Sequence, residues 1–349
     1  MTHEYEKVAT PASGLRLHLN ENTSGCSPAV LAALHSLTCA QAAFYPDQSD
    51  AVAACARHLG VDENHLLLTN GLDEGILAAT VAALRGSSET LPYEGIVVVP
   101  AFDEYAACID AVGGGVVEVP HGPDFSFPLD SVLRALNERT RIVFLTNPNN
   151  PTGLTIPRDA ILAIADAAPR AMVFLDEAYA DFSGTSLIGD AEAQSRQNIV
   201  IGRTFAKAYG LAALRVGAVI GSPATLRPIK RVLPPYSINV AAAVALPIAL
   251  ADTEHYESYL RETAESKQLL YAALDRLGVP YWRSETNFVL ARFGDNAARV
   301  VAGLAERGVH VRDKSRDHAC GGCLRITTGM TAHTRACITA IEEVLCPRP

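Results

Sequence analysis

Seven short apolar runs in the first two thirds of the chain constrain its fold most strongly. Continuous apolar runs are typical of strands buried on both faces, as in a parallel sheet. They are residues 66–69, 96–99, 116–119, 142–145, 172–175, 199–201 and 216–220. Ala- and Leu-rich stretches with helical patterns, such as 74–84 and 158–168, separate several of these runs. This alternation of strand and helix is the α/β pattern.

The last third of the chain has a different pattern. A long helical run from about residue 240 to 277 precedes three strand-like segments, at 287–292, 309–312 and 324–327. Because 349 residues exceed what one ordinary domain needs, we expect two packed lobes. The prediction is an α/β protein whose large lobe has a mostly parallel central sheet and whose smaller C-terminal lobe is α+β. The expected divisions are an N-terminal arm at 1–24, a large domain at 25–245 and a small domain at 246–349.

Charge and hydropathy exclude several classes of protein. The formal net charge is −9 and no Lys/Arg-rich run occurs, so we expect no nucleic-acid partner. No stretch of about 18 apolar residues is present, so we expect no membrane span. The first eleven residues are polar, without an apolar signal segment, which favours a cytoplasmic protein with reduced cysteines.

Two of the eight cysteines have CxxC spacing, Cys320-Gly-Gly-Cys323. Such a pair can carry redox chemistry or form half of a zinc site. A second close Cys or His pair is missing from the sequence, so a chance pair in a loop is the favoured interpretation and no metal site is expected. A stoichiometric zinc content in purified protein would revive the alternative.

Polar residues follow several of the predicted strands, where ligands bind in open α/β sheets. Asn70-Gly71 follows one strand and opens a helix, whose free backbone N–H groups suit a phosphate. Asp176 ends another strand, and Asn150 lies in a loop that two prolines keep extended. Each feature alone is compatible with an ordinary turn or helix cap. Neither GxxxxGK[ST] nor GxGxxG occurs, so ATP and dinucleotide sites lack their fingerprints.

Lys207 is the candidate nucleophile. The chain has only five lysines, and Lys207 alone follows a predicted buried strand. A lysine in an apolar, desolvated pocket has a lowered pKa and can form a Schiff base. A surface lysine on a loop is the alternative. Together with Asp176, Asn150 and the turn at Gly71, the pattern favours a pyridoxal-phosphate (PLP) enzyme.

Nine motifs, spread over nearly the whole chain, resemble those of a known protein family and occur in the same order. They are HLNEN at 18–22, YP at 45–46, TNGLDEGI at 69–76, PAFDEY at 100–105, NPNNPTG at 147–153, FLDEAYADF at 174–182, RTFAKAYGLAALRVG at 203–217, SETNFVLARF at 284–293 and CLRITTG at 323–329. The chain resembles fold-type I PLP-dependent aminotransferases of classes I and II, most closely the histidinol-phosphate aminotransferases.

The resemblance implies PLP as the cofactor and gives several residues a role at its ring. Lys207 would bind PLP as a Schiff base and then act as general acid and base. Asp176 would pair with the ring nitrogen and keep the ring an electron sink. Asn150 and Tyr179 would hydrogen-bond the ring O3′, and Phe102 would stack on the ring face. Lys207, Asp176 and Tyr179 are therefore the expected catalytic residues.

The same resemblance assigns residues to the cofactor phosphate and implies a homodimer. The expected phosphate-binding residues are Gly71, Leu72, Asp73, Thr204 and Arg215. Tyr45 resembles the tyrosine that reaches the cofactor of the neighbouring subunit, so we expect it to act across a dimer interface.

On the substrate side, the resemblance implies that Arg325 binds the α-carboxylate, a task that suits a planar guanidinium. Arg312 would contact a distal phosphate, with a solvated salt bridge as the alternative, and Asn150 and Asn22 would complete the site. The implied substrates are an amino-acid-like donor, histidinol phosphate first, and a 2-oxo acid acceptor, 2-oxoglutarate first. The implied kinetics are ping-pong, and the implied pathway is histidine biosynthesis.

Three departures from the resemblance bear on specificity. Phe102 stands where many relatives have tyrosine, Ala206 replaces a common serine, and the segment 20–25 lacks the usual proline and bulky residue. An aromatic amino-acid aminotransferase and a threonine-phosphate decarboxylase-like enzyme therefore stay as alternatives. The same lysine and aspartate serve those reactions, because PLP stabilises the carbanion whichever bond breaks.

Overall fold

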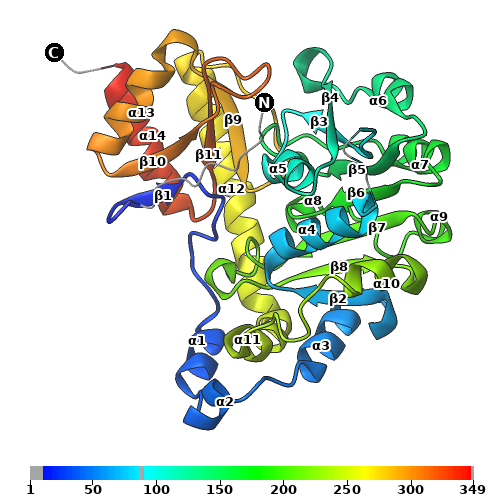
Figure 1. Ribbon diagram of the computed structural model, residues 1–349. Helices are drawn as coiled ribbons and strands as arrows, with labels where there is room; N and C mark the ends of the chain where they lie inside the picture. The colour runs from blue at the N-terminus through cyan, green and yellow to red at the C-terminus, as the bar shows by residue number, and fades with distance from the viewer. Residues whose placement is uncertain (1–10, 87, 89, 347–349) are drawn as a thin grey trace.

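The computed structural model describes residues 11–86, 88 and 90–346. A seven-stranded sheet with the order β2-β8-β7-β6-β5-β3-β4 forms the centre of the large lobe (Figure 1). Its strands are β2 (Leu66–Thr69), β3 (Glu94–Val99), β4 (Gly115–Pro120), β5 (Thr140–Thr146), β6 (Met172–Asp176), β7 (Ile199–Thr204) and β8 (Gly217–Gly221). All seven apolar runs are therefore strands. Only β8 runs antiparallel to its neighbours, so the prediction of a mostly parallel sheet is confirmed.

Helices cover both faces of this sheet, which explains why its strands lack polar alternation. Along β5, Val143 and Leu145 pack into one apolar cluster, while Ile142 and Phe144 pack into another on the opposite face. The first cluster includes residues of α1 (Pro28–His35), α3 (Ser49–Leu59), α7 (Arg158–Ala167) and α11 (Val240–Ala251). The second includes residues of α4 (Gly71–Leu84), α5 (Glu104–Ala111) and α10 (Pro223–Lys230).

Shorter elements complete the large lobe. They are α2 (Cys39–Ala43), α6 (Leu129–Ala135), α8 (Ala180–Ser183), α9 (Ala191–Ser195) and the 3-10 turns η1 (Glu63–His65), η2 (Pro123–Phe125) and η3 (Ala212–Leu214).

A four-stranded sheet forms the small lobe, with the order β1-β10-β11-β9 (Figure 1). The three predicted C-terminal strands are present as β9 (Phe288–Arg292), β10 (Val309–Asp313) and β11 (Cys323–Thr327), with η4 (Gly294–Asn296), α13 (Ala297–Glu306) and α14 (Thr331–Leu345) beside them. The fourth strand, β1 (Leu15–Leu17), belongs to the predicted arm and pairs in parallel with β10. Part of the arm is thus built into the small lobe.

The predicted helical run from 240 to 277 is present, but it consists of two helices. It forms α11 and then α12 (Thr253–Leu277), with a break at Asp252. The Asp252 carboxylate accepts a hydrogen bond from the backbone N–H of His255 at 3.2 Å and caps the second helix. Aspartate favours this capping role over a helix interior, because its carboxylate satisfies free N–H groups of the first turn.

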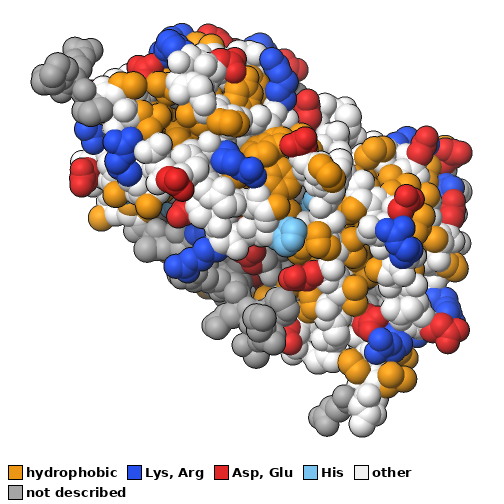
Figure 2. Space-filling view, turned by 90° about the horizontal axis from the view of Figure 1, so that it is seen from above, with side chains coloured by type: hydrophobic (Ala, Val, Ile, Leu, Met, Phe, Trp, Pro, Cys, Tyr) orange, Lys and Arg blue, Asp and Glu red, His pale blue; other side chains and the backbone are white. Residues whose placement is uncertain are grey.

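The surface carries both signs of charge side by side. Figure 2 shows Lys and Arg side chains interspersed with Asp and Glu over one face of the molecule. Within the described ranges, no helix is long and apolar enough to cross a membrane.

Candidate active site

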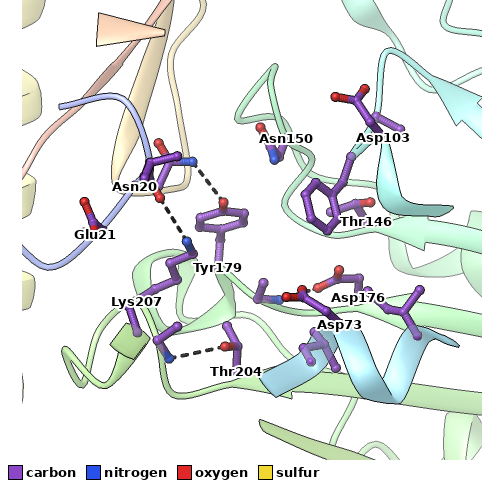
Figure 3. A pocket seen from close by; sticks show the side chains of 18 of the residues that line it. Asn20, Glu21, Asp73, Asp103, Thr146, Asn150, Asp176, Tyr179, Thr204 and Lys207 are labelled. Carbon is purple, nitrogen blue, oxygen red and sulfur yellow. Dashed lines mark hydrogen bonds between the residues drawn. The ribbon is translucent and has the colours of Figure 1, made fainter. Parts of the chain in front are cut away.

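A cavity of about 270 Å³ lies where β5, β6 and β7 end, between the large sheet and the small lobe. Figure 3 shows Lys207, Asp176, Tyr179 and Asn150 converging on it from different segments. The sequence-predicted residues that line it are Leu72, Asp73, Phe102, Asn150, Asp176, Tyr179, Thr204, Lys207, Arg215, Arg312 and Arg325.

Asp176, the last residue of β6, places a buried carboxylate in this cavity. One oxygen accepts the hydroxyl proton of Tyr105 at 2.6 Å, and the other accepts the backbone N–H of Ala178 at 2.9 Å. Burial raises the pKa of Asp176 to about 6, and these hydrogen bonds oppose the rise. The carboxyl group is therefore largely ionised at neutral pH, and a buried anion of this kind suits a cationic ring N–H.

Tyr105 is a site residue that the sequence reasoning missed. Its ring is fully buried, and its hydroxyl lies 2.9 Å from the hydroxyl of Thr146 as well as against Asp176. It also packs edge-to-face on Phe102, with ring centroids 5.7 Å apart. The signal was available, because Tyr105 stands three residues after Phe102 in the same PAFDEY motif.

We expect the affinity of the apoprotein for PLP to fall as the pH drops through about 6, because Asp176 then becomes protonated. The Tyr105→Phe variant lacks the hydrogen bond that lowers the pKa of Asp176, so its midpoint should lie at a higher pH. Titrating both apoproteins with PLP between pH 5 and 8 measures the difference. The phosphate of PLP titrates identically in the two experiments, so equal midpoints would contradict this role of Tyr105.

Lys207 follows β7 by three residues and turns its amine into the cavity. The amine donates a hydrogen bond to the backbone carbonyl oxygen of Leu19 at 3.1 Å. Burial, with a smaller contribution from the Arg325 cation, lowers the pKa of Lys207 to about 8. A useful fraction of the amine is therefore unprotonated near neutral pH, as a nucleophile requires.

The arm contributes Asn20 to the cavity, in place of the predicted Asn22. The Asn20 amide donates to the Tyr179 hydroxyl at 2.9 Å, and its carbonyl oxygen accepts from Thr327 at 3.0 Å. The Asn22 side chain instead donates to the backbone carbonyl of Ala208 at 2.9 Å, and it is not among the residues that line the cavity. The two asparagines of the NEN motif cannot be told apart by sequence, because the path of the arm between the lobes decides which one faces inward.

The N-terminus of α4 forms the end of the cavity that suits an anion. Gly71 has a φ of +75°, and a Cβ atom there would lie 2.4 Å from Nη2 of Arg215. The positive φ favours glycine at this position, and the lack of a Cβ lets the guanidinium lie beside the free N–H groups of the helix. Arg215 also contacts the Asp73 carboxylate at 2.6 Å, and Thr204 adds a hydroxyl. Backbone N–H groups, a guanidinium and a hydroxyl together fit a phosphate group.

Two arginines of the small lobe face the opposite side of the cavity. Arg312 on β10 and Arg325 on β11 are directly paired positions of the antiparallel ladder. The Arg325 guanidinium donates to the Asn150 side-chain oxygen at 2.6 Å and to the backbone carbonyl of His18 at 2.7 Å. These contacts orient a planar donor that suits a carboxylate or a phosphate.

Two further sequence predictions fall outside this cavity. Tyr45 is 78% exposed, and its ring stacks on that of Tyr236, with centroids 4.3 Å apart. Its contribution across a dimer interface stays a prediction. Cys320 and Cys323 are both buried free thiols. No group of three or more His, Cys, Asp or Glu side chains that could hold a metal occurs in the part of the chain described by the structure.

Comparison with known proteins places this geometry in a family. The family model of aminotransferases class I and II matches residues 12–340. Histidinol-phosphate aminotransferase 2 of Ralstonia nicotianae is 37% identical, and the alignment covers 95% of this chain and 88% of that protein. The chain belongs to the class I and II aminotransferases. It is a PLP-dependent aminotransferase with the type I fold, most similar to the histidinol-phosphate aminotransferases.

Solved structures agree with this assignment. The histidinol-phosphate aminotransferase of Sinorhizobium meliloti, in complex with pyridoxal-5'-phosphate, has a TM-score of 0.84 at 26% identity over 95% of this chain and 91% of that one. The L-threonine-O-3-phosphate decarboxylase of Porphyromonas gingivalis has a TM-score of 0.78 at 25% identity over 95% of this chain and 99% of that one. The shared fold therefore serves both amino transfer and decarboxylation.

Proposed function

We propose that this enzyme transfers the amino group of histidinol phosphate to 2-oxoglutarate, with PLP bound at Lys207. One observation carries the proposal: a single cavity joins a buried lysine and a buried carboxylate to the paired arginines 312 and 325. The names of the most similar relatives support the choice of donor. PLP, when bound, supplies an electron sink that stabilises negative charge at the α-carbon of the substrate.

The residues at the large-lobe end would hold the cofactor. The Asp176 carboxylate would keep the ring nitrogen protonated, Asn150 and Tyr179 would donate to the ring O3′, and Phe102 would pack on the ring face. The α4 N-terminus would hold the phosphate, through the backbone N–H groups of residues 71–73 together with Thr204 and Arg215. Tyr45 of a second subunit would reach the same phosphate, so we propose that the active enzyme is a homodimer.

Lys207 would move the proton in the reaction. Its lowered pKa of about 8 leaves part of the amine free to accept the proton from the α-carbon of the substrate. The carbonyl of Leu19, 3.1 Å from the amine, holds it at the edge of the cavity. The amine would then deliver this proton to the cofactor carbon that is bonded to the substrate nitrogen. Water would release the oxo product and leave the amino group on the cofactor, so the product leaves before the acceptor binds and the kinetics are ping-pong.

Arg325 would bind the anionic group next to the α-carbon of either substrate, and Arg312 would add a contact to the phosphate of the donor. Histidinol phosphate has a phosphate ester where an amino acid has a carboxylate, so its anion extends further from the α-carbon. The adjacent position of Arg312 on the ladder suits this longer group. Arg325, fixed by Asn150 and His18, contacts both kinds of anion.

Substitution of the two arginines tests this assignment. We expect Arg325→Ala to lower kcat/KM for every amino donor by about 10- to 100-fold, which is the effect of losing a charge-assisted hydrogen bond. Arg312→Ala should weaken histidinol phosphate by a similar factor and phenylalanine much less. Steady-state kinetics with both donors measure the difference. Equal losses for the two donors in Arg312→Ala would overturn its phosphate-binding role.

A panel of amino donors tests the proposed reaction itself. Histidinol phosphate, phenylalanine and threonine phosphate are each assayed for 2-oxoglutarate consumption and for CO2 release. The proposal requires the highest kcat/KM for histidinol phosphate, with no CO2 and with parallel lines in double-reciprocal plots. Preference for phenylalanine would favour an aromatic aminotransferase. Release of CO2 from threonine phosphate would favour the decarboxylase.

A further inference from the structure

Lys314 is a cavity residue to which the proposed reaction has assigned no role. It follows β10 directly, two residues after Arg312, and its backbone N–H donates to the carbonyl of Cys323 at 3.0 Å, which continues the ladder with β11. Alternate residues of a strand point to the same face. Lys314 therefore joins Arg312 and Arg325 on the face that lines the cavity.

The ammonium group of Lys314 is buried and held in place. The side chain is only 7% exposed, and its amine lies 2.5 Å from a carboxylate oxygen of Asp317. Asp317 is not among the residues that line the cavity, so it contacts the amine from the side away from the cavity. An ammonium group has three N–H donors, and a single hydrogen bond to Asp317 leaves two for another acceptor.

The spacing of the three cations fits a ligand with two anionic groups. Diagonal neighbours on an antiparallel pair, such as Arg325 and Lys314, are roughly 7–8 Å apart at the backbone. The terminal carbons of an extended five-carbon diacid are roughly 5 Å apart, given C–C bonds of about 1.5 Å. Side chains that converge on the cavity can therefore contact both carboxylates of such a diacid at once.

We propose that Lys314 determines specificity for the five-carbon dicarboxylic substrate pair by binding the carboxylate remote from the reacting carbon, while Arg325 binds the nearer one. The proposal rests on the proposed function, in which glutamate and 2-oxoglutarate are that pair. Histidinol phosphate has a single anionic group, which Arg312 and Arg325 bind. Lys314 thus distinguishes the acceptor from the donor within one cavity.

The test uses glutarate and butyrate as probes of the holoenzyme, since they differ in one carboxylate and neither can react. Their dissociation constants are measured by calorimetry in the wild type, Lys314→Met and Arg316→Met. Arg316 is an exposed cation on the same loop that does not line the cavity, so its variant controls for loss of charge. We expect Lys314→Met to raise the dissociation constant of glutarate by roughly 10- to 100-fold. The dissociation constant of butyrate in Lys314→Met, and those of both probes in Arg316→Met, should change by less than about threefold.

Steady-state kinetics supply the second measurement. The KM for 2-oxoglutarate should rise in Lys314→Met, while the KM for histidinol phosphate stays near the wild-type value. Should Lys314→Met fail to fold because Asp317 is left unpaired, the double variant Lys314→Met/Asp317→Leu removes both charges and serves the same test. Unchanged glutarate binding, or an equal loss for glutarate and butyrate, would overturn the role of Lys314.

The two proposals fail in different ways. If wild-type enzyme turns over histidinol phosphate but Lys314→Met keeps its preference for glutarate over butyrate, the role of Lys314 is wrong and the proposed reaction stands. If the preference depends on Lys314 but histidinol phosphate is not a donor, the proposed donor is wrong and the dicarboxylate site stands.

Discussion

Lys207→Ala should lower kcat/KM for amino transfer by roughly 10⁴-fold or more, because it removes both the nucleophile and the general base. The cavity offers no replacement at the same place: its other cationic residues are Arg215, Arg312, Lys314 and Arg325. Arginine stays protonated and cannot form a Schiff base at neutral pH. Lys314 projects from the small lobe and is ion-paired to Asp317.

The expected loss is measured by single-turnover kinetics and by two chemical signatures. Wild-type protein should absorb at about 420 nm, as a protonated Schiff base of PLP does. Borohydride should bleach this absorbance and fix the cofactor on the peptide that contains Lys207. The variant should show neither signature. Lys230→Ala, at an exposed lysine outside the cavity, should behave as wild type. Cofactor fixed on any peptide other than that of Lys207 would refute the assignment.

Most of the fold could be predicted because its strands are short, apolar and separate. Runs such as 142–145 and 172–175 are buried on both faces, so their hydrophobicity alone marks them. The break at Asp252 and the strand β1 were missed for different reasons. A side-chain cap interrupts the helix at Asp252 without any loss of helical pattern on either side. β1 has three residues and exists only through pairing with β10, which is far away in sequence.

The candidate site also contains some residues that could be predicted from the sequence and others that could not. Lys207, Asp176 and Gly71 follow strands, and strand ends of a parallel sheet converge, so their meeting was predictable. Asn20 and Lys314 enter the cavity from the arm and the small lobe. Their positions depend on how these segments pack against the large lobe, and no local pattern records that packing. Tyr105 lies between the two cases, since its motif was visible but its contact with Asp176 was not.

A buried charge network supports the strand end that carries Lys207. Arg203, in β7, is buried and places one guanidinium nitrogen 2.7 Å from an Asp181 oxygen and another 3.5 Å from a Glu177 oxygen. Glu177 also accepts hydrogen bonds from the Ser186 hydroxyl and the backbone N–H of Leu187. Neither Glu177 nor Arg203 lines the cavity, so we expect the network to act on the stability of the fold around the site.

We expect Arg203→Met to lower the free energy of unfolding by about 3–5 kcal/mol, because it leaves two buried carboxylates without their cation. Chemical denaturation of the holoenzyme, followed by circular dichroism, measures the loss. Arg158→Met is the matched control, since Arg158 makes comparable ion pairs with Asp190 and Glu192 at the surface. Solvent and salt screen surface pairs, so its effect should be much smaller. Similar losses in the two variants would contradict the importance of burial.

The pH dependence of the free energy of unfolding tests the Arg203 prediction independently. Burial raises the pKa of Glu177 above its usual 4.5, and the Arg203 cation opposes this rise. Without Arg203 the folded-state pKa rises further, so the folded variant binds more protons than the folded wild type above about pH 4.5. A group whose pKa is higher in the folded state than in the unfolded state lowers the free energy of unfolding as the pH rises. The deficit of Arg203→Met relative to wild type should therefore grow between pH 5 and 8. A deficit that stays constant over this range would mean that lost packing of the arginine side chain, which does not depend on pH, accounts for the destabilisation in place of unpaired charge.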